Sequence, residues 1–242
     1  MPNYVMNTVR VRGDDESLRA LWKLTENEQG EIGHLDFNKV IPMPEALKIE
    51  ESSVMHKGLK AVQDFMEIYS MEKTEEEFKA AIWNIPQSSI NAFLRMRTDV
   101  SREEWTLGLQ AYRNIAQYGA ASWYDWCVKN WGTKWNACEP TLDSDENDVD
   151  YLRFETAWSA PHPILEKLSE MFPNATFEHS SADEDLGNNC GERVYSGGKL
   201  QEEHIPTSLR EGLVLAGSLW ELSEEEINQF FEEDQEEGQV MV

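Results

Sequence analysis

The stretch YLRFETAWSAPHPILEKLSEMFPNATFEHS, residues 151–180, decides the fold class that we predict for this chain. Residues 151–158 alternate apolar and polar side chains, as a strand does when only one of its faces is buried. Residues 163–171 are predicted to form a helix that opens with proline, a residue tolerated at the first helical position. Residues 175–180 again favour a strand. The stretch therefore predicts one strand–helix–strand unit.

A second unit of the same kind is predicted at the N-terminus. Residues 3–11 alternate as a strand, and residues 17–24 have the apolar spacing of a helix. Residues 34–40 are expected to form the next strand, which Pro42 and Pro44 would end because proline removes a backbone donor. Two such units can share one sheet. We therefore predict an α+β fold: a ferredoxin-like antiparallel sheet with a large helical insertion between its two halves.

The middle third of the chain is expected to be helical. Thr74 with Glu77, and Ser101 with Glu104, have the spacing of capping boxes, in which a hydroxyl and a carboxylate satisfy the first backbone N–H groups of a helix. About four helices are expected here. The predicted segments are a first strand–helix–strand part (1–44), the helical insertion (45–130), the second half of the sheet (131–200) and an acidic C-terminal segment (201–242).

Net charge limits the classes of partner. The chain has 21 Lys and Arg residues against 46 Asp and Glu residues, a formal charge of −25. Such a molecule repels free nucleic acid and attracts proteins with basic surfaces. The alternative interpretation is that this charge only maintains solubility. The predicted partner-binding carboxylates are Asp143, Asp145, Glu146, Asp148, Asp150, Glu224, Glu225, Glu226, Glu232, Glu233 and Asp234.

Residues 122–138, SWYDWCVKNWGTKWNAC, are the densest aromatic feature of the sequence. In one interpretation, four residues here are a ligand site or a binding anchor, because aromatic rings interleaved with polar groups commonly line such sites. In the other interpretation the segment is structural, and a helix face that includes Trp123 and Trp126 packs on the sheet. The candidate anchors are Trp131, Lys134, Trp135 and Asn136.

No motif in the sequence indicates a catalytic residue, a resident metal or a cofactor. The cysteines Cys127, Cys138 and Cys190 are odd in number and widely spaced, which favours reduced thiols over a disulfide framework. The acidic run from Asp143 lacks the glycine of an EF-hand calcium loop, since Asp148 occupies that position. No secretory signal or membrane-spanning run is recognised. We expect a non-enzymatic cytoplasmic protein.

Four blocks of the sequence resemble a known family. They are MPNYVMNTVRVRG at residues 1–13, FNKVIPMPEAL at 37–47, WYDWCVKNWGTKWNA at 123–137 and FETAWSAPHPIL at 154–165. Together they are similar to YubB-like proteins, a family encoded by phages and plasmids. The resemblance implies a cytoplasmic protein of a mobile element, with a ferredoxin-like domain and no iron–sulfur cluster. It implies no reaction and no catalytic residues.

Three functional hypotheses follow. The first is an interaction protein of a phage or plasmid, which binds and inhibits a basic, nucleic-acid-handling host protein, such as a defence component, through its acidic surfaces. The second is a small-ligand or nucleotide-binding module, or an enzyme, that uses the Trp131–Asn136 region. The third is direct nucleic-acid binding by the sheet, which requires that Arg95, Arg97 and Lys129 gather on one side.

Overall fold

The computed structural model describes residues 3–70, 74, 77, 81–145 and 150–231 of the chain. It divides into two compact units. The sheet unit comprises Met1–Pro42 and Val128–Val242, and the helical unit comprises Met43–Cys127. The expected α+β class with an antiparallel sheet is confirmed.

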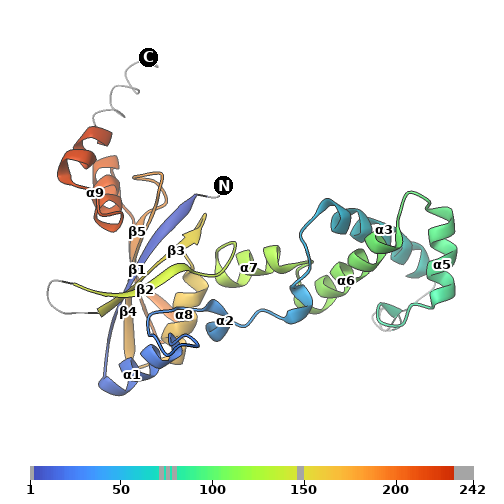
Figure 1. The fold of residues 1–242 in the computed structure, drawn as a ribbon, viewed down its shortest axis with the longest axis horizontal. Coiled ribbons are helices and arrows are strands. Elements are labelled where there is room, and N and C mark those ends of the chain that lie inside the picture. The colour runs from blue at the N-terminus through green and yellow to red at the C-terminus, as the bar shows by residue number, and fades with distance from the viewer. Residues whose placement is uncertain (1–2, 71–73, 75–76, 78–80, 146–149, 232–242) are drawn as a thin grey trace, which may run out of the picture. The chain divides into compact units, whose positions relative to one another are not determined.

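The sheet unit contains six strands in the order β2-β3-β1-β4-β5-β6, and every neighbouring pair is antiparallel (Figure 1). The order β2-β3-β1-β4 is that of a ferredoxin-like fold, in which two βαβ units interleave their strands. The N-terminal strand β1 is central and pairs with both β3 and β4. The strands are β1 (Tyr4–Gly13), β2 (Cys138–Ser144), β3 (Asp150–Ala157), β4 (Ala175–Asp183), β5 (Gly191–Ser196) and β6 (Lys199–His204).

The strand expected over residues 34–40 is wrong. Phe37–Val40 forms the short helix α2, in which Asp36 Oδ1 accepts a hydrogen bond from the backbone N–H of Asn38 (2.9 Å). The buried residues of α2 are its first and its last, which are three positions apart as on one face of a helix. A segment of only four residues is too short for its apolar pattern to distinguish a helix from a strand.

The second strand of the first βαβ unit is instead β2, which includes the start of the acidic run at Asp143. This strand contains Pro140 and irregular backbone, with Glu139 at a φ of 46°. Proline and a bulge are tolerated because β2 lies at the edge of the sheet. The helical unit is therefore inserted within the first βαβ unit, before β2.

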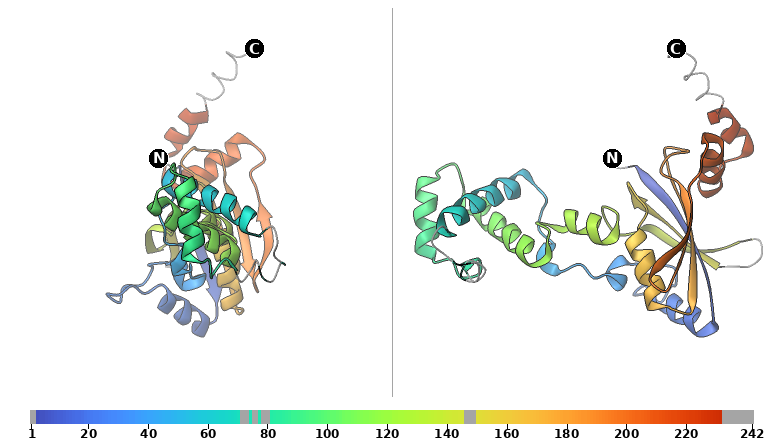
Figure 2. Two further views of the ribbon diagram at one scale, coloured as in Figure 1. Left: turned by 90° about the vertical axis from the view of Figure 1, so that its right-hand side faces the viewer. Right: turned by 180° about the vertical axis from the view of Figure 1, so that it is seen from behind.

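Helices cover both faces of the sheet (Figures 1 and 2). Helices α1 (Asp15–Leu24) and α8 (His162–Met171) lie on one face, over fully buried residues such as Val9 and Phe177. Helix α9 (Leu209–Leu219) lies on the other. Met6 and Ala182 from the sheet pack against Ala216 and Leu219 of this helix. Trp220 fixes its end by donating from Nε1 to the backbone oxygens of Ala182 and Asp183.

The helical unit is built on the close packing of two helices, α3 (Ser53–Ser70) and α6 (Arg102–Tyr118). Gly58 and Gly108 lie where they meet, and a Cβ atom on Gly108 would lie 2.0 Å from the backbone carbon of Gly58. No residue with a side chain fits there without displacing one helix. The remaining elements are η1 (Glu45–Leu47), α5 (Gln87–Met96) and α7 (Trp123–Trp131), which crosses from this unit into the sheet unit.

An aromatic cluster fills the core of the helical unit. Phe65 contacts Phe93 and Trp105 in edge-to-face geometry, each with ring centroids 5.3 Å apart. The two expected capping boxes are confirmed: the backbone N–H and hydroxyl contacts link Ser101 to Glu104 and Thr74 to Glu77.

Candidate functional site

The sheet presents a largely uncovered surface beside α9. We define the α9 face as the side chains that project to the same side of the sheet as Met6. Residues that are directly opposite each other on neighbouring strands project to the same side of the sheet, so Glu155 and Ala182, which are opposite Met6, belong to this face. Every second residue along each strand then projects to the same side. Its charged members are Arg10, Arg12, Asp143, Arg153, Glu155, Glu178, Glu192, Lys199 and Glu202.

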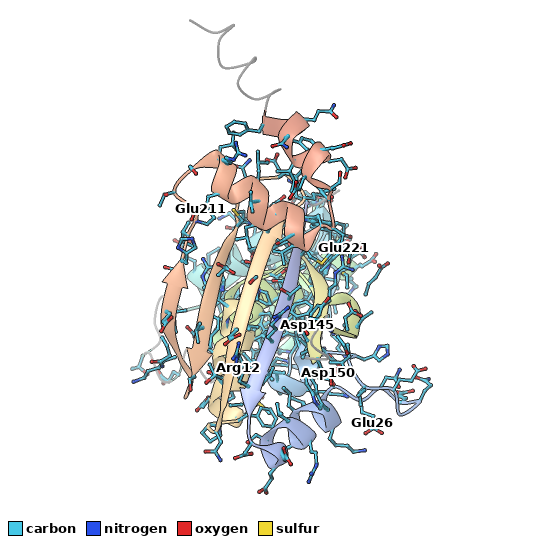
Figure 3. All side chains as sticks on the ribbon, turned by 90° about the vertical axis from the view of Figure 1, so that its left-hand side faces the viewer. Arg12, Glu26, Asp145, Asp150, Glu211 and Glu221 are labelled. Carbon is cyan, nitrogen blue, oxygen red and sulfur yellow. The ribbon has the colours of Figure 1, made fainter. Side chains whose placement is uncertain are left out.

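Each arginine of the α9 face forms an ion pair with a nearby carboxylate. Arg10 binds Asp145 (3.0 Å), Arg12 binds Glu178 (2.7 Å) and Arg153 reaches Glu221 (3.5 Å). Figure 3 shows this side of the sheet, with Arg12 on the strands, Asp145 and Asp150 at the β2–β3 edge, and Glu221 at the end of α9. Since the remaining carboxylates of the face have no arginine of their own, the surface is net negative.

A groove of about 640 Å³ lies on this face, between α9 and the strands β4 to β6. Its wall on α9 is apolar, and the β6 end is fixed by His204, which is 2.8 Å from Glu211 of α9. Glu192 and Glu202 are exposed at the groove. The lining includes Thr8, Glu178, Ser180, Glu192, Val194, Glu202, His204, Leu215, Ser218 and Leu219.

Three of the acidic residues predicted to bind a partner belong to the β2–β3 hairpin. Asp143 is half-buried on the α9 face, and Asp150 is exposed and accepts a hydrogen bond from Ser144 Oγ (2.7 Å). The side chain of Asp145 is only 12% exposed and neutralises Arg10, so its charge is used within the protein. Glu146 and Asp148 lie outside the described residues.

Within the predicted acidic C-terminal segment, residues 224–231 form a helix that follows Ser223. Glu224 and Glu225 are exposed. Glu226 accepts hydrogen bonds from the backbone N–H and the hydroxyl of Ser223 (2.8 and 2.7 Å), and the backbone contact lowers the pKa of its carboxyl group. The role of these carboxylates in binding stays a prediction. Glu232, Glu233 and Asp234 lie outside the described residues.

Two of the four candidate anchors in the aromatic segment have structural roles. Trp131 is buried against Phe37 (ring centroids 5.7 Å apart), and its Nε1 donates to the backbone oxygen of Ile41 (2.8 Å). Asn136 Oδ1 accepts from the backbone N–H of Phe37 (2.8 Å), and its Nδ2 donates to Asp36 (2.7 Å). These two side chains therefore hold α2 in place.

The other two anchors are half-buried and form a stack with Trp158. Lys134 Nζ lies 4.7 Å from the ring centroid of Trp135 and 4.5 Å from that of Trp158. Trp158 is 42% exposed and has a φ of 72°, a conformation that costs free energy in a residue other than glycine. The cation–π contacts give this stack a fixed shape at the surface.

The three cysteines are free thiols in the structure. Burial raises the pKa of the Cys127 thiol to about 12, which makes it a poor nucleophile. Within the described ranges, no group of three or more His, Cys, Asp or Glu residues could hold a metal ion. No helix in that part of the chain is both long and apolar enough to cross a membrane.

The basic residues of the third hypothesis are divided between the two units. Arg97 is committed to Asp64 (3.0 Å) and Asp99 (2.9 Å) within the helical unit. Arg95 belongs to the same unit and Lys129 belongs to the sheet unit.

Sequence reasoning missed Glu178, Glu192 and Glu202, because it looked for acidic runs. These residues lie on the same side of three adjacent strands, β4, β5 and β6, and they are far apart in the sequence or separated by a turn. The alternation within each strand could have shown which side of the sheet each glutamate faces. It could not have shown which strands are neighbours, and therefore not that the three glutamates lie close together.

Comparisons with known proteins concern mainly the second half of the chain. Among proteins with curated descriptions, none matches this chain. The crystal structure of the protein api92 from Yersinia pseudotuberculosis is 10% identical, with a TM-score of 0.43; the match covers 86% of this chain and 99% of that one. Residues 130–237 match the family model described as "Ferredoxin-like domain in Api92-like protein". The part of the chain that follows the helical unit is thus similar to the ferredoxin-like domain of Api92-like proteins.

Proposed function

We propose that this chain is a non-enzymatic interaction protein that binds the basic surface of a partner protein through the α9 face. The observation that carries the proposal is the charge arrangement of that face. Its arginines are neutralised by Asp145, Glu178 and Glu221, whereas Glu192 and Glu202 remain exposed beside the groove. Two arginines also line the groove, but Arg10 is paired with Asp145 and Arg193 with Glu203, so among the described residues Glu192 and Glu202 have no arginine as an ion-pair partner.

The groove suits the side chains of lysine and arginine. These residues combine a long apolar stem with a charged end. The apolar wall formed by Leu215 and Leu219 would contact the stem, while Glu192 and Glu202 would receive the charged end. A long basic side chain would thus bury apolar area and form a charge-assisted hydrogen bond in one step.

The class of partner follows from charge and from resemblance. A chain of charge −25 imitates the field of a nucleic acid, and proteins that handle nucleic acids carry basic surfaces. The similarity to YubB-like proteins of phages and plasmids favours a host protein of this kind, which the bound chain would inhibit. Origin and partner are parts of the proposal.

The test is a salt-dependent capture experiment. Immobilised full-length protein is exposed to host-cell lysate, bound proteins are eluted in salt steps, and the double variant Glu192→Gln/Glu202→Gln is compared with the wild type. We expect the double variant to retain less basic protein and to release it at lower salt. Glu28→Gln/Glu103→Gln is the matched control, because it removes the same charge from exposed positions away from the α9 face.

The proposal fails on either of two results. One is retention of the partner that is unaffected by salt and by the loss of Glu192 and Glu202. The other is an equal loss in the control variant, which would assign the effect to net charge and not to the α9 face.

A further inference from the structure

A second cavity, of about 280 Å³, lies in the sheet unit at the first turn of α8. It is separate from the α9 face, because Ser181 in its lining projects to the opposite side of the sheet from Ser180. Chemically distinct side chains converge there from α8, β4, β5 and the β4–β5 loop. The lining is Ala160, His162, Ser181, Gly187, Asn188, Asn189, Cys190, Arg193, Ile205 and Pro206.

The hydroxyl group of Ser181 is the first sign of a missing ligand. Ser181 is 2% exposed and lines the cavity, yet its side chain forms no hydrogen bond to any residue that the structure describes. The hydroxyl group is therefore available to a molecule that enters the cavity. Its neighbour Ser180, on the other side of the sheet, lies 3.4 Å from Glu192.

His162 can supply a second donor from Nε2 when its Nδ1 accepts a hydrogen bond. Its Nδ1 lies 2.8 Å from the hydroxyl oxygen of Tyr195. Burial raises the pKa of Tyr195 to about 12, and burial together with the charge of Arg193 lowers the pKa of His162 to about 4, although Glu203 opposes this. Both groups are then neutral at pH 7. A neutral phenol can donate to Nδ1 or accept from it; the donor set proposed below takes it as the donor, which places the ring proton on Nε2.

Arg193 supplies the positive charge. Its side chain is 15% exposed, and its Nε donates to Glu203 Oε1 (2.8 Å). This contact orients the guanidinium group and occupies only one of its five N–H donors. Helix α8, which begins at His162 without a side-chain cap, adds the partial positive charge of its N-terminus.

We propose that this cavity binds a small oxyanion, the carboxylate or phosphate group of a metabolite, with Ser181 Oγ, His162 Nε2 and the terminal nitrogens of Arg193 as donors. All three groups donate hydrogen bonds, and an oxyanion accepts them. Ala160, Ile205 and Pro206 provide an apolar wall for the rest of a small molecule. This inference is independent of the proposed function, which concerns the opposite face.

The test uses the full-length protein and two simple probes, inorganic phosphate and acetate, titrated at constant ionic strength. Binding is followed by ¹H–¹⁵N correlation spectra. We expect saturable shifts of the amides of residues 181 and 187–193. Ser181→Ala should weaken binding about tenfold. It should also leave folding intact, because the wild-type hydroxyl has no hydrogen bond to lose.

Ser180→Ala is the matched control and should bind as the wild type does. Saturation by phosphate alone or by acetate alone supports the site and identifies the chemical group. The inference is overturned if neither anion shifts these amides, or if Ser181→Ala and Arg193→Gln bind as tightly as the wild type. Long-range ¹H–¹⁵N spectra give a second readout, and a proton on His162 Nδ1 would contradict the donor set.

Discussion

The two units differ in what their cores contain. The core of the helical unit is mainly apolar, with Phe65, Phe93 and Trp105 at its centre, and it buries the polar side chains of Asn114 and Ser122. The sheet unit buries polar side chains beside its apolar ones, among them Asn7, Thr156, His179 and Ser181, each at most 2% exposed. Buried polar groups stabilise only when they are paired, so they demand a specific arrangement. Most of the buried polar side chains of the described residues lie in the sheet unit, so we look for binding sites there.

The largest expected effect is a loss of stability in the helical unit. In Gly108→Leu, a side chain must enter the contact with Gly58, where there is no room even for a Cβ atom. We expect a loss of about 3 kcal/mol or more in the stability of that unit. Hydrogen exchange read by mass spectrometry should show lost protection in α3 and α6, with β1 and β4 unchanged. Ala116→Leu, on the exposed side of α6, is the control and should preserve protection.

The next largest effect is a loss of stability in the sheet unit when its buried polar network is disrupted. Asn7 Nδ2 donates to the backbone oxygen of Val5 (2.8 Å) and to Thr156 Oγ1 (2.9 Å), and its Oδ1 accepts from His179 Nε2 (3.0 Å). Because His179 Nδ1 already has no partner among the described residues, Asn7→Ala leaves the whole ring unpaired. Denaturant unfolding should show a loss of about 2–4 kcal/mol. Thr8→Ala, on the α9 face, should cost less than about 1 kcal/mol; equal losses would contradict this account.

The stability of the sheet unit should depend on pH through His179, and this dependence distinguishes it from the helical unit. Burial, together with the charges of His162 and Arg193, lowers the pKa of His179 to about 3 from its ordinary value of 6.5. Between about pH 3 and pH 6.5, His179 therefore binds a proton in the unfolded chain but not in the folded chain. The stability from the neutral ring is present above pH 6.5 and is lost as the pH falls, by about 2 kcal/mol at pH 5.

The helical unit should respond only at lower pH. Hydrogen bonds from Lys60 and Arg97 lower the pKa of Asp64, and a hydrogen bond from Lys57 lowers that of Glu104. Their contribution is present above the ordinary carboxyl pKa and is lost below about pH 4. Hydrogen exchange between pH 7 and 5, corrected for intrinsic rates, should show weakening of β4 before α6. Simultaneous weakening would contradict the assignment to His179.

The smallest effects separate the structural and the partly exposed residues of the aromatic segment. Asn136→Ala removes the contacts to Phe37 and Asp36 and should lower stability by about 1–3 kcal/mol. Lys134→Ala removes only surface cation–π contacts with Trp135 and Trp158, and should cost less than about 1 kcal/mol. Thermal unfolding measures both. A larger effect at Lys134 would show that the stack supports the fold.

The sequence predicted the features that depend on nearby residues. Capping boxes at Thr74 and Ser101 were recognisable because both partners lie within three residues. The strands β1, β3 and β4 were recognisable from alternation. The acidic residues of the β2–β3 hairpin were identified, but the pairing of Asp145 with Arg10 joins residues far apart in the chain, which no local pattern shows.

The sequence by itself determined the α+β class, the helical block and the large negative charge, since these follow from composition and short-range periodicity. Only the tertiary structure decided that Cys138–Ser144 is a strand, because its register with β3 outweighs the weak preference of a segment containing proline. Only the tertiary structure brought Glu192 and Glu202 to one groove, and Ser181, His162 and Arg193 to one cavity. Pairing between distant strands fixes these positions, and that pairing depends on the whole sheet.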